Sequence, residues 1–257
     1  MTVLAILQAR VSSTRLPNKV LAPILGRPML ARQIERLRRA TSLDNLVVAT
    51  SDDVSDDQLA ALCAAIGVHC YRGSLHDVLA RFQGASVAHG PADHIVRLTG
   101  DCPLADPAVV DAIVLHHLTS GADYTTNAIQ PSWPDGLDVE VMRAEILQRA
   151  FDEARLPSER EHVTPYIHKR PELFRVEHVK GDRDLSNLRW TVDEAADLAF
   201  VSEVYAALYL KNPAFDTSDI LVLLEQRPEL AKLNGQFLRN EGYAKSLAAD
   251  TPNLPSN

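Results

Sequence analysis

The densest group of potentially reactive side chains lies near the start of the chain, in the stretch ILQARVSSTRLPNKVL (residues 6–21). It contains three cations, Arg10, Arg15 and Lys19, and no acid. Guanidinium groups bind phosphate oxygens in bidentate fashion, and a lysine adds a mobile point charge. The combination is typical of a binding site for a phosphorylated ligand, although a solvated surface loop with three cations would show the same pattern.

The charge distribution favours a compact anionic ligand over a nucleic acid. Residues 1–40 carry eight cations and one acid, whereas the whole chain of 257 residues has a net charge of −8. An acidic protein is a poor general nucleic-acid binder, but a local cationic zone attracts a small anion. The sequence has no Walker A motif and no GxGxxG, so phosphate binding falls to the side chains of this loop.

Strand and helix patterns alternate regularly over the first 120 residues. Strands are predicted at 2–8, 45–50, 68–72 and 93–101, and helices at 29–40, 55–67, 74–89 and 107–120. This alternation indicates an α/β fold with a parallel sheet and helices on both faces. Ligands bind beyond the carboxyl ends of such strands. We therefore expect the loops after Gln8, Thr50, Tyr71 and Leu98 to share one rim.

The rhythm changes after residue 121. Short strand patterns and helices follow one another up to residue 180, and a further strand is predicted at 188–193. We expect one domain over 1–210 with an inserted element at 124–180. A helical extension is expected over 211–257, and its last ~15 residues, polar with two prolines, are expected to be flexible.

The stretch QARVSSTRLPNKVL (residues 8–21) resembles the signature of the cytidylyltransferases that activate acidic sugars, of the acylneuraminate and 3-deoxy-manno-octulosonate (Kdo) type. Its form is closest to the SpsF-like branch, known from spore-coat polysaccharides, and the resemblance extends over roughly residues 1–210. It implies a mostly parallel, doubly wound, Rossmann-like α/β sheet of the nucleotide-diphospho-sugar transferase type. It also implies a small inserted dimerisation or lid element, which would cross to the partner of a homodimer.

The resemblance implies that this loop wraps the triphosphate of CTP. Arg10, Ser13, Arg15 and Lys19 would contact phosphates, and Arg15 and Lys19 would act in catalysis by stabilising the departing pyrophosphate.

The stretch YRGSLHDVLARF (residues 71–82) looks like the family segment beside the nucleobase. Arg72 would approach the cytosine, and Asp77 would hold the base pocket. Asp77 could equally be an acid in the first helical turn, where it favours the helix dipole.

The stretch RLTGDCPL (residues 97–104) looks like the metal motif of the family, with Asp101 as a catalytic carboxylate that binds Mg²⁺. Asp193, at the end of the strand predicted at 188–193, matches the second metal carboxylate. The alternative for Asp193 is a cap of the following helix. The expected cofactor is Mg²⁺.

Acceptor binding is assigned to two further stretches. In PDGLDVEV, Asp138 and Glu140 alternate with apolar residues and share one strand face. They would contact the acceptor or a second metal, or form a solvent-facing pair in a dimer arm. In SEREHVTPYI, Arg160 and His162 would meet an anionic group of the acceptor, although His162 could also be an ordinary helix residue.

The implied reaction is transfer of CMP from CTP to an anionic small molecule, an acidic sugar or similar, with release of pyrophosphate. Such an enzyme would serve polysaccharide biosynthesis. GDCPL stands where Kdo-type enzymes have GDEPL, so the acceptor stays open and could be a phosphonate. A GT-A-like glycosyltransferase using a nucleotide-sugar donor is the main rival, but it would usually carry an Asp-x-Asp metal motif. A non-catalytic binding module is a third possibility.

Location and partners follow from what the sequence lacks. No apolar run reaches the ~18 residues of a membrane span, and the N-terminus does not read as a signal peptide. The cysteines, Cys63, Cys70 and Cys102, are odd in number and lack metal-like spacing, as in reduced proteins of the cytoplasm. We expect a cytoplasmic enzyme with CTP and an acceptor as partners, and neither nucleic acid nor membrane.

Overall fold

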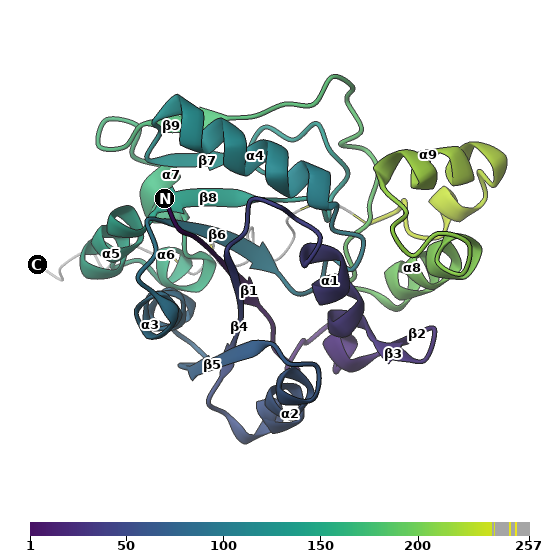
Figure 1. The fold of residues 1–257 in the computed structure, drawn as a ribbon, viewed down its shortest axis with the longest axis horizontal. Coiled ribbons are helices and arrows are strands. Elements are labelled where there is room, and N and C mark those ends of the chain that lie inside the picture. The colour runs from purple at the N-terminus through teal and green to yellow at the C-terminus, as the bar shows by residue number, and fades with distance from the viewer. Residues whose placement is uncertain (238, 240–246, 248–249, 251–257) are drawn as a thin grey trace, which may run out of the picture.

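The computed structural model describes residues 1–237, 239, 247 and 250, and it is built on one seven-stranded sheet (Figure 1). The strand order is β5-β4-β1-β6-β8-β7-β9. The strands are β1 (Val3–Gln8), β4 (Asn45–Ser51), β5 (His69–Gly73), β6 (His94–Thr99), β7 (Tyr124–Thr126), β8 (Glu140–Arg143) and β9 (Val176–His178). A separate two-stranded hairpin consists of β2 (Pro23–Ile24) and β3 (Arg27–Pro28).

Helices connect most of these strands. The α-helices are α1 (Met29–Leu37), α2 (Asp57–Ala65), α3 (Val78–His89), α4 (Pro107–Ser120), α5 (Ala144–Glu153), α6 (Pro157–His162), α7 (Pro165–His168), α8 (Ala195–Leu208) and α9 (Thr217–Gln226). Three short 3₁₀ helices are η1 (Lys19–Leu21), η2 (Val54–Asp56) and η3 (Leu230–Lys232). The predicted flexible tail lies almost entirely outside the described residues. Among the described residues, none of the helices is both long and apolar enough to cross a membrane.

The sheet has a parallel and an antiparallel part. Strands β5, β4, β1 and β6 all pair in parallel, as the alternation predicts. β8 runs antiparallel to both β6 and β7, and β9 pairs in parallel with β7. The predicted mostly parallel α/β fold is thus confirmed. Residues 124–180 supply three strands of the same sheet, and their assignment to a dimerisation or lid element stays a prediction.

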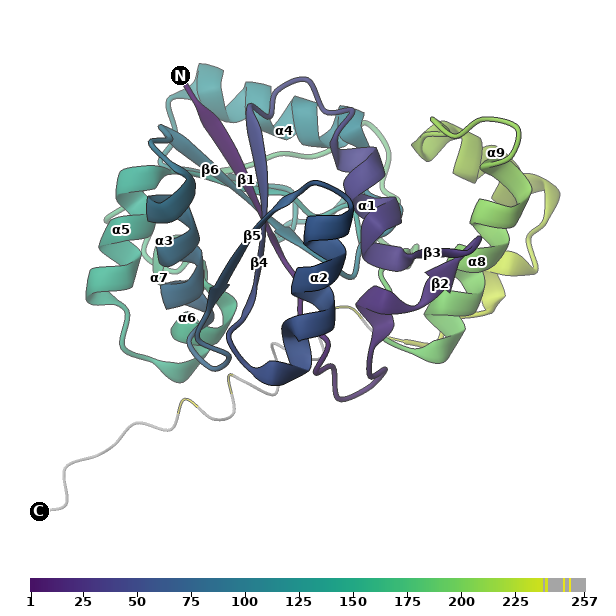
Figure 2. The ribbon, with the colours of Figure 1, turned by 60° about the horizontal axis from the view of Figure 1, so that its bottom comes forward.

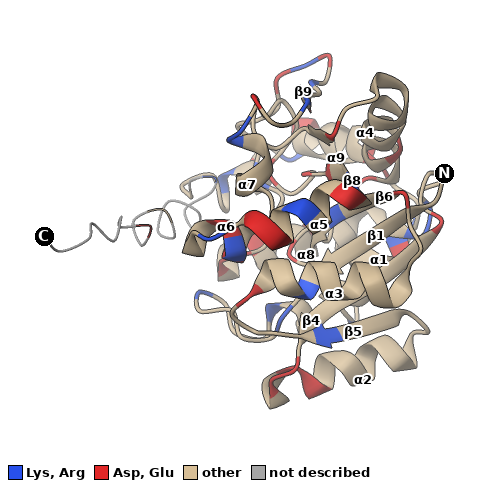
Figure 3. Cartoon of the chain, turned by 90° about the vertical axis from the view of Figure 1, so that its left-hand side faces the viewer, with Lys and Arg blue, Asp and Glu red and all other residues tan. Residues whose placement is uncertain are grey.

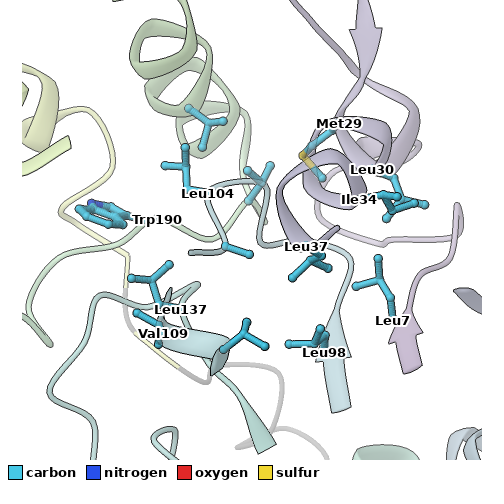
Figure 4. Close-up of a cluster of buried hydrophobic side chains, with 14 of the residues drawn as sticks. Leu7, Met29, Leu30, Ile34, Leu37, Leu98, Leu104, Val109, Leu137 and Trp190 are labelled. Carbon is cyan, nitrogen blue, oxygen red and sulfur yellow. The ribbon is translucent and has the colours of Figure 1, made fainter. Parts of the chain in front are cut away.

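Each face of the sheet is covered by its own hydrophobic core. On one face, apolar residues of β1 and β6 pack against α1, α4 and α8, and Figure 4 shows Leu7 and Leu98 facing Ile34 and Leu37 in this core. On the other face, α3, α5 and α7 pack around Phe82 and Tyr124. Figure 2 shows α8 and α9 beside α1 and the β2–β3 hairpin. Two covered faces leave only the strand ends open for a ligand.

The prediction of a strand at 188–193 is wrong. This segment forms only an isolated bridge between Arg189 and Asp135. Its alternating apolar residues are buried because Trp190 and Val192 pack into the core, not because they belong to a ladder. Their backbone N–H groups donate to loop carbonyls instead, from Trp190 to Asp135 at 2.6 Å and from Val192 to Asp101 at 2.8 Å. The segment is therefore tied to the carboxyl end of β6.

Candidate active site

Two adjoining cavities open at the carboxyl ends of β1 and β6. One, of about 430 Å³, is lined by the loop after β1 and contains the side chains of Arg10, Ser13 and Lys19. The other, of about 470 Å³, is lined mainly by residues from β6, β8 and the segment around α6 and α7. The residues that line both cavities are Arg15, Thr99, Asp101, His162 and Asp193. We call the first the cationic cavity and the second the acidic cavity.

The loop after β1 is held in a fixed course by its own backbone. The N–H groups of Ser13 and Asn18 both donate to the carbonyl of Val11, at 2.8 and 3.1 Å. Asn18 adopts a left-handed conformation with φ of 61°, which asparagine tolerates better than most residues. The chain then enters η1 at Lys19. These turns direct several cations of one short loop toward the cationic cavity.

The buried carboxylate of Asp56 anchors this loop to the neighbouring strand. It accepts hydrogen bonds from the N–H of Val11 at 2.7 Å and from the N–H of Ser51 at 3.1 Å, and also from the hydroxyl of Ser51. The side chain is fully buried. Asp56 therefore fixes the loop after β1 relative to the end of β4.

A close approach of two backbones places Asp101. Gly100 donates its N–H to the carbonyl of Gln8 at 2.7 Å, and a Cβ at this position would lie 2.8 Å from the Cβ of Ala9. Any side chain at residue 100 would push the end of β6 away from β1. The glycine of the RLTGD stretch thus lets the Asp101 carboxylate lie beside the loop that carries Lys19.

Lys19 lies at the centre of the site. Its ammonium contacts the Asp193 carboxylate at 2.8 Å, the Val192 carbonyl at 2.8 Å and the Asp101 carboxylate at 3.2 Å. The Lys19 side chain is only 9% exposed. Lys19 and Asp101 lie side by side, as predicted. Lys19, Asp101 and Asp193 come from positions far apart in the chain.

The ion pair between Lys19 and Asp101 keeps both side chains charged. Burial opposes the charged form of Lys19, but the carboxylates of Asp101 and Asp193 outweigh it and raise the pKa of the ammonium. Burial likewise opposes ionisation of Asp101, yet the nearby ammonium lowers the pKa of this carboxyl group to about 2. Lys19 and Asp101 therefore both stay charged at neutral pH in a largely buried site.

Asp193 is available for the site because other residues cap α8. The Asp197 carboxylate accepts the N–H groups of Asp193 and Glu194, each at 2.9 Å, and Glu194 is the N-cap residue. The Asp193 carboxylate instead pairs with Lys19 and with Arg15, whose guanidinium lies at 2.9 Å. The helix thus orients Asp193 without using its side chain.

A second ion cluster lies behind Asp193. The guanidinium of Arg189 donates to Asp197 at 2.9 Å, to Asp135 at 3.1 Å and to Asp193 at 3.3 Å. The Asn234 amide donates to Asp197 at 2.9 Å and to the carbonyl of Arg189 at 3.0 Å. This buried network fixes the segment that carries Asp193.

The oxygens around Lys19 suit a divalent metal that also binds a triphosphate. Among the described residues, no three His, Cys, Asp or Glu side chains gather in a way that could hold a metal ion by themselves. Mg²⁺ commonly uses one or two carboxylates and completes its shell with phosphate oxygens and water. Asp101 and Asp193 fit that mode, because both line the cationic and the acidic cavity.

Asp138 and Glu140 both line the acidic cavity, but they do not share a strand face, because β8 begins at Glu140 and Asp138 precedes it. Glu140 is buried and accepts from Arg97, from the Tyr124 hydroxyl at 2.5 Å and from the Thr164 hydroxyl at 2.6 Å. Asp138 contacts the guanidinium of Arg239. Glu140 is therefore held by protein partners, and a direct role of either acid in acceptor binding stays a prediction.

Burial, together with the nearby acids Asp135, Glu140 and Asp101, raises the pKa of the Asp138 carboxyl group to about 7 against the opposing effect of Arg239. The acidic cavity therefore contains one carboxyl group that titrates close to neutral pH.

The helix α6 places Arg160 and His162 in different surroundings. His162 lines both main cavities, and burial lowers the pKa of its imidazole, so the ring is neutral at pH 7. Arg160 donates to the Asp77 carboxylate, with Nε at 3.1 Å, and to the carbonyl of Phe151 at 2.8 Å. Asp77 also accepts the N–H of Ala80 and so caps α3. Figure 3 shows α6, with acidic and basic residues, next to α3.

A third cavity of about 380 Å³ continues from the cationic one, with which it shares Gln8, Arg10, Glu161 and His162. Leu75, His76 and Val78, from the stretch predicted to lie beside the nucleobase, line it, as does Arg160.

Arg72 is not among the residues that line the three cavities described above. Its guanidinium donates to the carbonyls of Ser51 at 3.0 Å and Asp53 at 2.9 Å, and it pairs with Asp57 at 2.7 Å. In this arrangement Arg72 joins the ends of β4 and β5. Its predicted contact with cytosine is untested.

Several residues of the site have no sequence pattern of their own. Asp56 contacts Val11, Arg189 contacts Asp135 and Arg239 contacts Asp138, and spacing alone does not reveal these contacts across at least 40 positions. Arg97 begins the RLTGDCPL stretch and lies on β6, which ends before Asp101. This position in the stretch was the only feature of the sequence that indicated a place in the site.

Comparison with known proteins identifies the family. The family model described as cytidylyltransferase matches residues 4–223. The spore coat polysaccharide biosynthesis protein SpsF of Bacillus subtilis is 37% identical over 244 residues, which is 89% of this chain and 96% of that protein. The chain therefore belongs to the cytidylyltransferase family, and the predicted relationship to its SpsF-like and Kdo-type members is confirmed.

Comparison with solved structures agrees with this family assignment. A cytidylyltransferase from Leptospira borgpetersenii serovar Hardjo-bovis is 31% identical, with a TM-score of 0.87 over 93% of this chain and 100% of that one. The structure of CMP:2-keto-3-deoxy-manno-octonic acid synthetase complexed with CTP has a TM-score of 0.62 and 18% identity over 80% of this chain and 99% of that one. At this identity, the second comparison shows the shared fold alone.

Proposed function

We propose that the protein transfers CMP from CTP to a hydroxyl group of an anionic small molecule, with Mg²⁺ as cofactor and pyrophosphate as second product. The observation that carries the proposal is the meeting of two cavities at Arg15, Asp101 and Asp193. A transfer between two substrates needs such adjoining sites, because the reacting atoms must be held close together. Membership of the cytidylyltransferase family supplies the reaction class.

The cationic cavity is the proposed site of the triphosphate. Arg10, Arg15 and Lys19 line it, together with the hydroxyl-bearing Ser13 and Thr14. The third cavity, which continues from it past Arg10, would receive the cytosine. Its lining includes apolar atoms of Leu75 and Val78, which suit the faces of a base. The nucleotide would thus lie along the loops that follow β1 and β5.

The acidic cavity is the proposed site of the acceptor. Its lining contains five carboxylates, whereas its arginines are Arg15 and Arg97, and both already pair with carboxylates. An anionic acceptor must therefore exchange with one of these ion pairs. The hydroxyl of Thr164 and the neutral ring of His168 add polar groups for a sugar-like ligand.

The proposed step is an in-line displacement at the α-phosphorus. The acceptor oxygen forms the new bond to phosphorus, the bond to the bridging oxygen of the β-phosphate breaks, and the hydroxyl proton passes to solvent. Arg15 and Lys19 would stabilise charge on the departing pyrophosphate. Asp101 and Asp193 would hold Mg²⁺, which supplies Lewis-acid neutralisation of phosphate charge when bound.

A pyrophosphate-release assay with CTP and Mg²⁺ tests the proposal. The acceptor panel contains acidic sugars such as Kdo and sialic acids, phosphonates, and neutral sugars of similar size. A parallel nucleotide panel of CTP, UTP, ATP and GTP tests base choice, and a nucleotide-sugar donor tests the glycosyltransferase alternative. Pyrophosphate release that requires both CTP and an anionic acceptor supports the proposal. Turnover of a nucleotide sugar without pyrophosphate release contradicts it.

A further inference from the structure

The ammonium of Lys19 has three N–H donors, and the structure supplies three oxygen acceptors for them. Two are carboxylate oxygens, of Asp101 and Asp193, and the third is the backbone carbonyl oxygen of Val192. All three distances lie between 2.8 and 3.2 Å. The hydrogen-bonding capacity of the ammonium is therefore fully used without any ligand.

The same three oxygens are the kind of ligand that a hard divalent cation uses. Carboxylate and backbone carbonyl oxygens bind Mg²⁺ and Mn²⁺, and the described residues offer no third acidic side chain grouped with Asp101 and Asp193 to hold such an ion. A metal ion that approaches these carboxylates meets a buried ammonium already bound to both of them. The ammonium and the metal therefore compete for one set of oxygens.

We propose that Lys19 occupies the divalent-metal position while no nucleotide is bound, so that metal binds tightly only together with a triphosphate. The proposal deepens the proposed function, since it takes the triphosphate to be the alternative partner of Lys19. Lys19 lines the cationic cavity, so phosphate oxygens placed there can accept its N–H groups in place of the carboxylates. Asp101 and Asp193 then lose Lys19 as a partner and can bind the metal, while the second carboxylate oxygen of Asp193 keeps its contact with Arg189.

This exchange explains why the site tolerates two adjacent carboxylates. Without a metal, unpaired acids in a largely buried site would repel each other and lose solvation. The ammonium compensates their charge in the nucleotide-free protein. It also makes binding reciprocal: a nucleotide that raises metal affinity by a given factor must itself gain the same factor from the metal.

Titration of the protein with Mn²⁺ alone, with free Mn²⁺ measured by electron paramagnetic resonance, tests the proposal without any turnover. The variant Lys19→Met removes the ammonium and keeps the length of the side chain. We expect it to bind Mn²⁺ about tenfold or more tightly than the wild type does. Lys19→Arg keeps a cation near the carboxylates and is expected to bind Mn²⁺ as weakly as the wild type.

Two further variants keep the test decisive. In the Lys19→Met background, Asp101→Asn should abolish the gained Mn²⁺ affinity, which assigns the new site to this carboxylate. If Lys19→Met does not fold, as judged by circular dichroism, Lys19→Gln replaces it. Equal Mn²⁺ affinity of the wild type and a folded Lys19→Met or Lys19→Gln variant overturns the proposal.

Failure of this inference can be distinguished from failure of the proposed function. Addition of CTP to the wild type should raise its Mn²⁺ affinity about tenfold or more. If the Lys19→Met variant gains Mn²⁺ affinity but CTP has no effect on the wild type, the competition between lysine and metal stands and CTP is the wrong nucleotide. If CTP is turned over but Lys19→Met gains no metal affinity, the proposed function stands and this inference fails.

Discussion

Two ion clusters meet at Asp193, and they differ in what surrounds them. In the first, Lys19 pairs with Asp101 and Asp193, and all three side chains line the cationic cavity. In the second, Arg189 pairs with Asp135, Asp193 and Asp197, and Arg189 and Asp197 are 7% and 0% exposed. Lys19 of the first cluster lines the cationic cavity, whereas Arg189 and Asp197 of the second line none of the three cavities.

Similar ion pairs therefore have different roles in the two clusters. Lys19 can exchange its carboxylate partners for a phosphate, because a cavity adjoins it. Arg189 forms hydrogen bonds with the carboxylate that caps α8 and with the loop that contains Asp135, so its contacts hold backbone segments together. We therefore expect loss of Lys19 to affect chemistry and loss of Arg189 to affect folding.

The strongest way to break this comparison is to remove Arg189. Arg189→Met leaves Asp135 and Asp197 buried without their shared cation, and such a loss costs about 3–5 kcal/mol of the free energy of unfolding. Urea denaturation measures it. Arg227→Met is the matched control, since Arg227 pairs with Glu203 and Glu229 at the surface and should leave stability nearly unchanged. Equal stability of the two variants would refute the scaffolding role of Arg189.

Removing Lys19 tests the other side of the comparison. Lys19→Ala should lower turnover about 10²–10³-fold, because a cation that stabilises developing charge in a preorganised site is lost. The melting temperature should fall less than in Arg189→Met, because Asp193 keeps Arg15 and Arg189 as partners and the Asp101 side chain is 28% exposed. Steady-state kinetics of pyrophosphate release measure the effect, with Lys211→Ala, an exposed lysine, as control. Unchanged turnover in a folded Lys19→Ala protein contradicts the assigned role.

Asp56 sharpens the comparison, because it is a buried scaffold residue whose effect should appear at the nucleotide. Asp56→Asn retains one acceptor oxygen for the N–H groups of Val11 and Ser51, so the loop after β1 should lose its fixed course. We expect CTP affinity to fall about tenfold, which corresponds to the loss of one buried hydrogen bond.

Asp106→Asn is the matched control for Asp56→Asn. Asp106 is also buried and accepts two backbone N–H groups and a hydroxyl, from Ala108 and Thr217, in a region away from the loop after β1. It should lose a similar amount of stability and keep its CTP affinity, as measured by calorimetric titration. If both variants lose CTP affinity equally, Asp56 has only a general structural role.

The comparison also shows how much of this site the sequence could predict. The loop that carries Arg10, Ser13, Arg15 and Lys19 is one continuous stretch after a strand, so its pattern is local, and these residues line the cationic cavity. The alternation of strands and helices predicted the sheet, because burial of alternating elements leaves few other arrangements. Family resemblance brought Asp101 and Asp193 into the same prediction.

The cluster around Arg189 could not be predicted in this way. Arg189, Asp193 and Asp197 lie within nine consecutive residues, but Asp135 and Asn234 join them only through tertiary contacts from distant parts of the chain. The apolar alternation of residues 188–193 even indicated a strand, since burial against a core produces the same pattern as a ladder. Arg72 and Arg160 show a further limit, because the family resemblance placed both near a ligand without showing their protein partners. In the structure Arg72 donates to two carbonyls and pairs with Asp57. Arg160 donates to Asp77 and to the Phe151 carbonyl and also lines the third cavity, so both roles stay predictions.

The smallest expected effect concerns two carboxyl groups of the acidic cavity whose pKa values shift in opposite directions. Asp101 has a pKa of about 2 beside Lys19, whereas burial and nearby acids raise the pKa of Asp138 to about 7. Between the unfolded value of 3.8 and about 7, the folded protein keeps on Asp138 a proton that the unfolded chain has lost. Stability must therefore fall as pH rises through this window.

Asp138→Asn removes this titration and should flatten the dependence of stability on pH. We expect the wild type to lose more of its free energy of unfolding between pH 5 and pH 8 than the variant does, as measured by urea denaturation at both pH values. Glu145→Gln is the control, since the Glu145 side chain is 73% exposed and should leave the pH profile parallel to that of the wild type. A parallel profile for Asp138→Asn would mean that Arg239 keeps this carboxyl group ionised, and that Asp138 resembles Asp101 after all.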